Sequence, residues 1–443
     1  MEFSLANARY RTAVLTGSIL IAALMIFQAG ELWLANHWVA SGDLTLMERG
    51  AALVPGDGSS WDALGHARQW TFSDFDLLGA IADYEKALHD NPRSAHYWMD
   101  LASSYELSGQ DSKAESAYAR AQQVYPASAE VAFYYGNFLL QRQDYPAAFA
   151  QLRRAVSGDR SFLPLAISRA WRATGDTKLI LEQLLPARAD AYDQAIDYFA
   201  SIHQGDAALA AWSRLVGLRA ALPLPRTFPL FDELIRENRS ADARRIWPEA
   251  LTLAGVADNQ TGNDSLVWNG NFSDEFTDGG LGWRWDPVPG VYLSFDSPPP
   301  QGSGRSLRMD FNDGSNVDLS APYEYVPVSP ETSYHFHAMM RTDGITTESG
   351  LRFAISDPNH PNAVYATTEN FIGTHAWTPV DADFTTGPDT AFLAVRLMRP
   401  QSRLFDNKLG GTAWIAAVSL VPATVPAAVR APVPTQAAPE PRK

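Results

Sequence analysis

The sequence contains no cysteine. Disulfides, thiolate zinc sites, cysteine nucleophiles and a lipid-modified N-terminal cysteine are therefore all excluded. The same absence leaves the cellular compartment open, because a chain without cysteine is stable in an oxidising or a reducing environment.

Basic residues are few relative to acidic ones. The chain has 35 Lys and Arg against 50 Asp and Glu, which gives a net charge of −15 at pH 7. A nucleic-acid-binding protein normally presents a strongly basic face, so we expect no nucleic-acid partner. Hydrophobic residues make up 46% and charged residues 19% of the 443 positions. Such a composition indicates a folded chain of about two to four domains.

Motifs that mark common enzyme classes are missing. The sequence has no phosphate-binding Gly-Lys-Ser/Thr loop, no dinucleotide-binding fingerprint, no HExxH and no nucleophile elbow. We therefore predict a protein that is not an enzyme, with no catalytic residue, no metal ligand and no cofactor. The acidic pair Asp381 and Asp383 is expected to be solvated on a strand. An alternative is a glycan-active enzyme with two carboxylates about 5 Å apart, although no pair of residues is nominated by the sequence.

One long apolar run lies near the N-terminus. Residues 12–30 form an uncharged stretch of 19 residues, close to the about 20 needed to cross a bilayer. Two arginines precede this stretch and a glutamate follows it, so the positive-inside rule keeps the N-terminus in the cytoplasm. The pattern predicts a cytoplasmic segment (1–11) and a transmembrane signal anchor (12–34). The rest of the chain would lie outside a bacterial inner membrane, in the periplasm.

Two alternatives to this anchor stay open. In a cleaved signal peptide the apolar core is usually shorter, about 7–15 residues. Cleavage after Ala29 would also place Phe27 where a small residue is preferred. The other alternative is a buried helix of a soluble domain.

A set of residues recurs every 34 positions in the first half of the chain. It consists of a small residue, a large one, a small one and a closing residue, at Ala80, Tyr84, Ala87 and Pro92, then Ala114, Tyr118, Ala121 and Pro126, then Ala148, Leu152, Ala155 and Arg160. In the central unit, the helix before this set carries Trp98, Leu101, Ala102 and Tyr105. Gly136 stands 34 residues after Ala102, in the next unit. Small residues at fixed positions allow paired helices to approach closely.

These residues resemble the tetratricopeptide repeat (TPR). The resemblance implies about five helical hairpins over residues 45–255, arranged as a right-handed superhelix whose groove binds a protein partner. The first unit departs from the pattern, because the distance from Trp61, Leu64 and Gly65 to Ala80 is three residues too long. For each repeat aromatic, packing between helices is the simpler role.

Short alternating segments replace the helical pattern after a turn-rich linker near Asp258. Alternation is clear where apolar residues occupy every second position, as in Leu307, Met309 and Phe311, in Tyr334, Phe336, Ala338 and Met340, in Leu351, Phe353 and Ile355, and in Leu393, Val395 and Leu397. We expect about eight strands, and hence an antiparallel β-sandwich or jelly roll over residues 258–421. Residues 422–443 are rich in proline and alanine and are predicted to be a disordered tail.

The segments WNGNFSDEF and GLGW, ending at Trp283, resemble the start of the galactose-binding-like jelly roll of many carbohydrate-binding modules. This resemblance implies glycan binding and makes Trp283 and Trp377 core residues. The family commonly has an acidic pair in its last strand, where this chain has Ala416 and Ala417. A structural calcium ion is therefore possible but unsupported, since the remaining Asp274 and Glu275 are too few ligands.

Candidate ligand-binding residues fall into two sets. The first set is basic and alternates with the core residues: Arg308, His335, His337, Arg341, Arg352 and Arg396. If their strands share a sheet, these residues would form one basic patch that suits an acidic polysaccharide. Aromatic residues outside the core pattern could stack on sugar rings: Trp285, Tyr292, Tyr323 and Tyr365. Ordinary solvated polar residues are the simpler interpretation. The two histidines at i and i+2 could supply half of a metal site, with no third ligand identified.

The whole pattern predicts a membrane-anchored, extracytoplasmic scaffold or adaptor with two binding modules. The helical repeat would bind a protein and the sandwich a glycan, plausibly beside machinery for polysaccharide assembly or export. A purely protein-binding scaffold with a structural sandwich is the main alternative.

Overall fold

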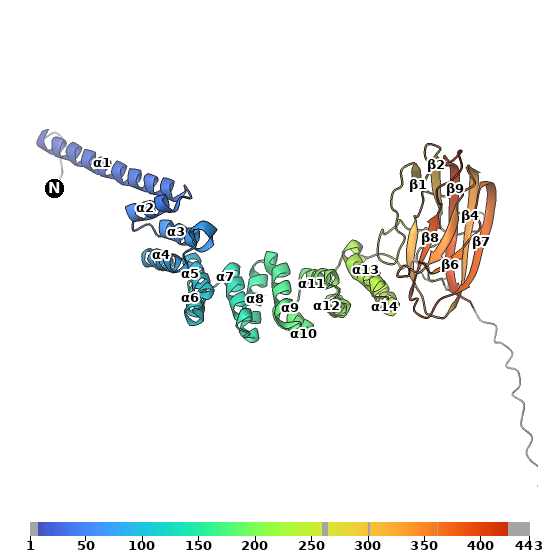
Figure 1. Cartoon of the computed structure of the whole chain (residues 1–443), viewed down its shortest axis with the longest axis horizontal. Coiled ribbons are helices and arrows are strands. Elements are labelled where there is room, and N and C mark those ends of the chain that lie inside the picture. Colours follow the sequence, from blue (N-terminus) through green and yellow to red (C-terminus); the bar gives the residue numbers. More distant parts are fainter. Residues whose placement is uncertain (1–7, 259–264, 300–301, 361, 424–443) are drawn as a thin grey trace, which may run out of the picture. The chain divides into compact units, whose positions relative to one another are not determined.

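The computed structural model of this chain describes residues 8–258, 265–299, 302–360 and 362–423. Helices come first and two antiparallel sheets follow, which confirms the predicted α-then-β fold (Figure 1). The chain forms two compact units, residues 1–191 and 192–443. The predicted tail lies outside the described residues from position 424 onward, and so do positions 259–264 of the linker.

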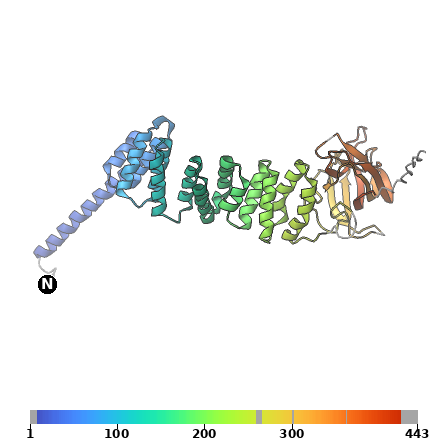
Figure 2. The same ribbon diagram turned by 90° about the horizontal axis from the view of Figure 1, so that it is seen from below.

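Helix α1 (Ala8–Val39) contains the apolar run. It is long and apolar enough to cross a membrane, and its most apolar window is exposed throughout. Only its C-terminal end contacts the other helices of its unit (Figure 2). There Ala35 is buried against Gly50 of α2 (Leu44–Leu53), where an added Cβ would lie 2.8 Å from the Ala35 carbonyl oxygen. The helix therefore continues from the apolar run into the folded helical region.

The remaining helices of the first unit form antiparallel pairs. These are α3 (Gly58–Trp70) with α4 (Leu77–Asp90), α5 (Ala95–Leu107) with α6 (Asp111–Val124), and α7 (Ala129–Gln141) with α8 (Tyr145–Gly158), followed by α9 (Leu163–Thr174), the short α10 (Thr177–Leu179) and a π-helical turn (Ile180–Leu184). Serines 34 residues apart begin two of these helices: Ser94 accepts from the Tyr97 amide, and Ser128 from the Val131 amide. The 34-residue period is thus visible in the helix caps as well.

In two of these helix pairs, α3/α4 and α7/α8, a glycine faces a large side chain. A Cβ added to Gly136 of α7 would lie 2.9 Å from the Leu152 side chain of α8. A Cβ added to Gly65 of α3 would lie 2.9 Å from the Tyr84 ring of α4. In the pair α5/α6, seven repeat residues occupy their expected helices and six of them are fully buried or nearly so: Leu101, Ala102, Tyr105, Ala114, Tyr118 and Ala121, with Trp98 half-buried. Ala148 is buried in α8, and Pro126 follows the end of α6.

The three extra residues of the first unit lie in the connection between α3 and α4. A 3₁₀ turn (Phe72–Asp74) lengthens this connection relative to that between α5 and α6. The pattern on either side of it is preserved. The Trp61 indole donates to the Pro55 carbonyl at 3.0 Å, and the Trp98 indole donates to the Pro92 carbonyl at the same distance.

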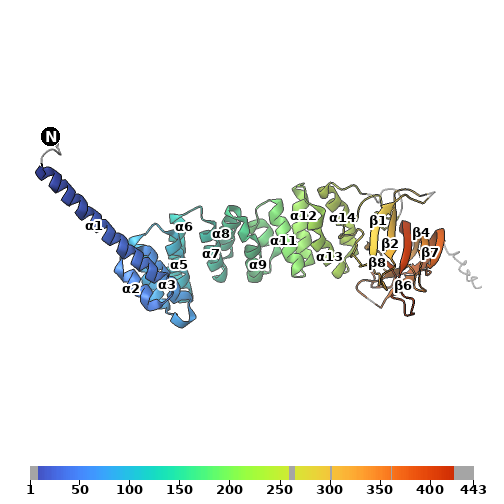
Figure 3. The same cartoon turned by 90° about the horizontal axis from the view of Figure 1, so that it is seen from above.

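The second unit begins with four further helices, α11 (Ala189–Ser201), α12 (Gly205–Gly217), α13 (Phe228–Arg236) and α14 (Ser240–Ala254). The later helices lie side by side along the chain (Figure 3). Trp212 and Trp247, which keep the repeat spacing, are both buried. Within this unit, Trp247 contacts Trp268 of the sandwich edge to face at 5.6 Å.

The sandwich has a five-stranded and a four-stranded sheet. The first is ordered β1 (Val291–Asp296), β2 (Ser306–Asn312), β9 (Gly410–Pro422), β4 (Ser333–Ile345), β7 (Gly373–Thr385). The second is ordered β3 (Tyr323–Pro327), β8 (Phe392–Met398), β5 (Arg352–Ser356), β6 (Val364–Thr367). Every apolar residue that the alternation assigned to the core is buried. Trp283 is also buried, whereas Trp377 is half-buried and lies outside the core cluster.

Replacing Gly136 with alanine should destabilise the first unit by about 1–3 kcal/mol, because the new methyl group meets both the side chain and the backbone of Leu152. Thermal unfolding followed by far-UV circular dichroism measures the effect. Gly56→Ala is the control, since nothing lies within 4 Å of its added Cβ. Equal melting of both variants would contradict the close approach of α7 and α8.

Candidate functional site

The six basic candidates lie on two different sheets. Four are on the outer face of the five-stranded sheet, where they alternate with buried neighbours on β2 and β4: Arg308, His335, His337 and Arg341. Arg352 of β5 and Arg396 of β8 belong to the four-stranded sheet. The single basic patch that a common sheet would produce is therefore divided. Alternation determines whether a residue faces inward or outward, but not which sheet its strand joins.

Arg308, Arg341 and Trp414 form an arginine–tryptophan platform on the five-stranded sheet. Trp414 of the central strand β9 is the register partner of Arg308 on one side and of Arg341 on the other. The guanidinium carbons lie 5.5 Å (Arg308) and 4.3 Å (Arg341) from the Trp414 ring centroid. The ring itself is only 8% exposed. Stacking on an indole holds a guanidinium in place while its edge stays free to donate.

The two arginines differ in their partners. Arg308 pairs with Asp310 at 2.9 Å and with Asp296 at 3.9 Å. Asp296 accepts from the Ser297 amide and from the Trp414 indole, and these hydrogen bonds hold its pKa below the ordinary value. Among the residues that the structure describes, Arg341 forms no ion pair. Its exposed guanidinium is near enough to Asp296 to help lower the pKa of that carboxyl, but it is the platform guanidinium without a direct carboxylate contact.

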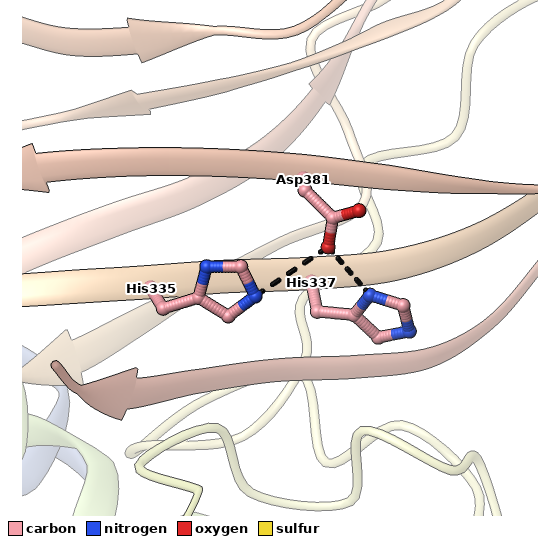
Figure 4. Close-up of side chains that lie close together, drawn as sticks. All are labelled: His335, His337 and Asp381. Carbon is pink, nitrogen blue, oxygen red and sulfur yellow. Dashed lines mark hydrogen bonds and ion pairs between the residues drawn. The ribbon is translucent and has the colours of Figure 1, made fainter. Parts of the chain in front are cut away.

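The two histidines of β4 face two aspartates of β7. His335 is paired with Asp383 and His337 with Asp381 across the strands. His335 Nδ1 lies 2.8 Å from Asp383 Oδ1, and His337 Nδ1 lies 2.7 Å from Asp381 Oδ1. His335 Nε2 lies 3.5 Å from the same Asp381 oxygen (Figure 4). The two aspartates are exposed, as expected, but each contacts a histidine.

The four aromatic candidates have three different environments. Tyr292 of β1 is 65% exposed on the same outer face as the platform, opposite Asp310. Tyr365 is held by a 2.6 Å hydrogen bond to Thr390 and by stacking on Phe384. Trp285 and Tyr323 line a separate cavity. Tyr292 is thus the only one of the four that lies on the face of the platform.

That separate cavity has a volume of about 480 Å³ and lies within the second unit. Trp285, Tyr323 and Tyr325 line it together with Arg284. The Arg284 guanidinium stacks over Tyr325 at 4.7 Å and pairs with Asp232 at 2.9 Å. Because this arginine is already neutralised, the cavity offers less to an anionic ligand than Arg341 does.

The helical region of the first unit contains a hollow of about 840 Å³ along α4, α5 and α6. Three repeat residues line it, Trp98, Leu101 and Tyr105, together with basic side chains that include Lys113 and Arg120. An apolar floor with a basic rim suits a protein segment that carries both apolar and acidic side chains.

Asp62, His96 and Asp100 form a titratable cluster on α3 and α5. His96 Nε2 lies 3.3 Å from Asp100 and 4.0 Å from Asp62. Burial, reinforced by the neighbouring Asp62 carboxylate, raises the pKa of Asp100 to about 7. The folded state therefore holds a proton that the unfolded chain releases near pH 4.

The two carboxylates considered for calcium differ in their surroundings. Asp274 is half-buried with one carboxylate oxygen unpartnered, and the exposed Glu275 pairs with Arg305 at 3.0 Å. In β9, Ala417 adopts a positive φ of 52° where the pairing with β4 changes register. The prediction that the chain holds no cofactor, with structural calcium unsupported, stays untested.

The wild-type chain should lose stability as pH rises from about 4 to 7, because over this range the unfolded chain ionises Asp100 while the folded state still holds its proton. Asp100→Asn keeps the site neutral and should be more stable than wild type at pH 8 by about 1–3 kcal/mol, with little difference at pH 4. Melting curves at both pH values measure this, and Asp90→Asn at an exposed position is the control. If the difference in melting temperature between Asp100→Asn and wild type were the same at both pH values, the raised pKa of Asp100 would be contradicted.

Comparisons with known proteins give resemblances to parts of the chain. No family model matches, and no curated protein matches. Among solved structures, Pseudomonas aeruginosa PilF is 16% identical, over 43% of this chain and 90% of that chain, with a TM-score of 0.29. A CBM4 structure is 12% identical over 35% of this chain and 99% of that chain (TM-score 0.27), and MamA protein is 16% identical over 45% and 92% (TM-score 0.24). At such TM-scores these resemblances assign no function, which must come from the chain's own residues.

Proposed function

We propose that this protein is a non-enzymatic, membrane-anchored scaffold of the TPR type. Its helical region binds a protein partner, and the outer face of its five-stranded sheet binds an acidic glycan. The bulk of the chain would lie on the periplasmic side of a bacterial inner membrane. A role in the assembly or export of a cell-surface polysaccharide would use both modules together.

The arginine–tryptophan platform carries this proposal. Arg341 combines an exposed guanidinium, a stacking partner that orients it and no competing ion pair among the described residues. A guanidinium in that state binds a carboxylate or sulfate through two parallel hydrogen bonds. The exposed Tyr292 ring on the same face can cover the apolar side of a sugar. Together they match a uronic acid or sulfated sugar better than a neutral one.

The hollow along α4–α6 supports the protein-binding part of the proposal. Its floor is mainly apolar, with Trp98 half-buried and Leu101 and Tyr105 buried. Lys113 and Arg120 at its rim outnumber the one acidic lining residue, Glu85, which favours an acidic partner segment. The main alternative is a scaffold in which the sandwich is structural and only this hollow binds a partner.

Helix α1 supports the membrane anchor. Its apolar window is fully exposed, and such a surface is stable in lipid but not in water. The protein should stay in the membrane pellet after alkaline carbonate extraction. In spheroplasts, added protease should degrade the folded part. Release by carbonate would indicate a cleaved signal, and protection from protease would reverse the proposed orientation.

The glycan proposal is tested by retention of the full-length chain, in detergent, on a column of an acidic polysaccharide such as alginate. Arg308→Ala with Arg341→Ala should reduce retention about tenfold or more, because the charge-assisted contact of Arg341 is lost together with the second guanidinium on the Trp414 ring. Arg352→Ala with Arg396→Ala removes the same charge from the other sheet and should leave retention unchanged.

Two results would contradict the proposal. Equal weakening by both pairs would mean that only net charge matters. No retention of the wild type on acidic glycans would move the binding function to the hollow of the helical region. Melting curves of both double variants show whether each is still folded. Arg341 is exposed, whereas Arg308, Arg352 and Arg396 are half-buried, so retention is compared only between variants that melt as folded proteins.

A further inference from the structure

The histidine–aspartate cluster across β4 and β7 has the chemistry of a metal site. His335, His337 and Asp381 each direct one ligand atom toward a common point, and these atoms all lie within 4.8 Å of one another (Figure 4). Two of the three contacts meet at a single atom, Asp381 Oδ1. In such an arrangement a metal ion can take the place of a proton that lies between the carboxylate oxygen and an imidazole nitrogen.

Asp383 gives this cluster an orienting group. Asp383 Oδ1 lies 2.8 Å from His335 Nδ1. With the proton of a neutral imidazole on Nδ1, Nε2 would be the nitrogen available to a metal ion on the side of Asp381. Metal-binding histidines in proteins usually have such a carboxylate on the second ring nitrogen, which fixes the tautomer and the ring direction.

The distances suit a small tetrahedral ion. Metal–ligand bonds of about 2.0–2.2 Å place tetrahedral ligand atoms roughly 3.3 Å apart. The contact from His335 Nε2 to Asp381 Oδ1, 3.5 Å, is already close to that value. The contact from His337 Nδ1, 2.7 Å, has to open slightly. The His337 and Asp381 side chains are 33% and 48% exposed, so a small rotation of either is available.

The neighbouring strand adds no competing cation. On β9 the residues paired with His335 and His337 are Val421 and Ser419, both uncharged. On β7 the facing residues are the two aspartates. With neutral imidazoles, the cluster therefore carries two negative charges and no built-in counter-charge from either adjacent strand.

We propose that His335, His337 and Asp381 bind a divalent transition metal of the zinc class, with Asp383 as the positioning residue. Two imidazoles and one carboxylate favour such an ion over calcium, which prefers oxygen ligands only. Solvent reaches all three ligands, so a fourth coordination position stays open to water or to a group of a bound molecule. This proposal does not depend on glycan binding.

A metal here would also join two strands. β7 is an edge strand of the five-stranded sheet and is held to the sheet by β4 alone. Ligands from both strands would cross-link the edge, so bound metal should raise the melting temperature of the sandwich.

The test is isothermal titration of the full-length chain in detergent with Zn²⁺ and, separately, with Ca²⁺. Every titration uses a chain with the substitution His96→Gln. His96 belongs to the other histidine–aspartate cluster, which could bind Zn²⁺ itself. We expect one Zn²⁺ per chain, no measurable Ca²⁺ binding at the same concentration, and an increase in melting temperature with Zn²⁺. His335→Gln with His337→Gln should abolish Zn²⁺ binding.

Two single variants sharpen the result. Asp383→Asn keeps all three ligands and should weaken Zn²⁺ binding about 10–100-fold, as loss of an orienting partner does. The control His375→Gln changes an exposed histidine on β7, outside the cluster, and should leave Zn²⁺ binding unchanged. The proposal is overturned if the wild-type cluster binds no Zn²⁺ at 100-fold molar excess, or if the double histidine variant, folded by circular dichroism, binds Zn²⁺ as before. Equal Zn²⁺ and Ca²⁺ binding would also overturn it.

Discussion

The close approach of paired helices depends on residues that have almost no side chain. Gly65 faces Tyr84 and Gly136 faces Leu152, each with room for hydrogen but not for a methyl group. The large residue fills the space that the small one leaves, and this exchange repeats along the chain. Because the spacing of these contacts fixes where each helix begins and ends, the three extra residues of the first unit are confined to the connection between α3 and α4.

A comparable constraint organises the sandwich through its central strand. β9 lies between β2 and β4, so its Trp414 meets one arginine from each side. Arg308 and Arg341 are far apart in the sequence and become neighbours only through this ring. The same sheet then places histidines and aspartates on β4 and β7. Its outer face thus combines a cationic part and an anionic part, which suits two different ligands.

Much of this fold was predictable from the sequence because it follows local periodicity. The 34-residue spacing identified Ala114, Tyr118 and Ala121, and all three are buried. Two-residue alternation identified the core residues of β2, β4, β5 and β8. The site was less predictable because it depends on pairing between distant strands. Arg352 and Arg396 alternate like the other arginines, yet the order of strands sends them to the second sheet.

The pairing of histidines with aspartates shows the same limit. Alternation places His335 and Asp383 on outer faces, but the register of β4 against β7 decides that they meet. That register is set by the core of both sheets together and by irregular pairing in both strands. A sequence pattern that extends over a few residues does not contain it.

Helix α1 runs without a break from the apolar run to Ala35, where it contacts Gly50 of α2. If α1 is a membrane anchor, this has a consequence for how the protein meets its partners. With the predicted anchor (12–34) in a bilayer, Ala35 would follow it directly, so α2 and the helices packed on it would be held close to the membrane surface. A helix without slack also transmits rotation, whereas a flexible tether would not. The helical hollow would therefore sweep a thin layer above the membrane at nearly constant height. Binding partners that are themselves embedded in that membrane would be met far more often than those diffusing in the surrounding volume.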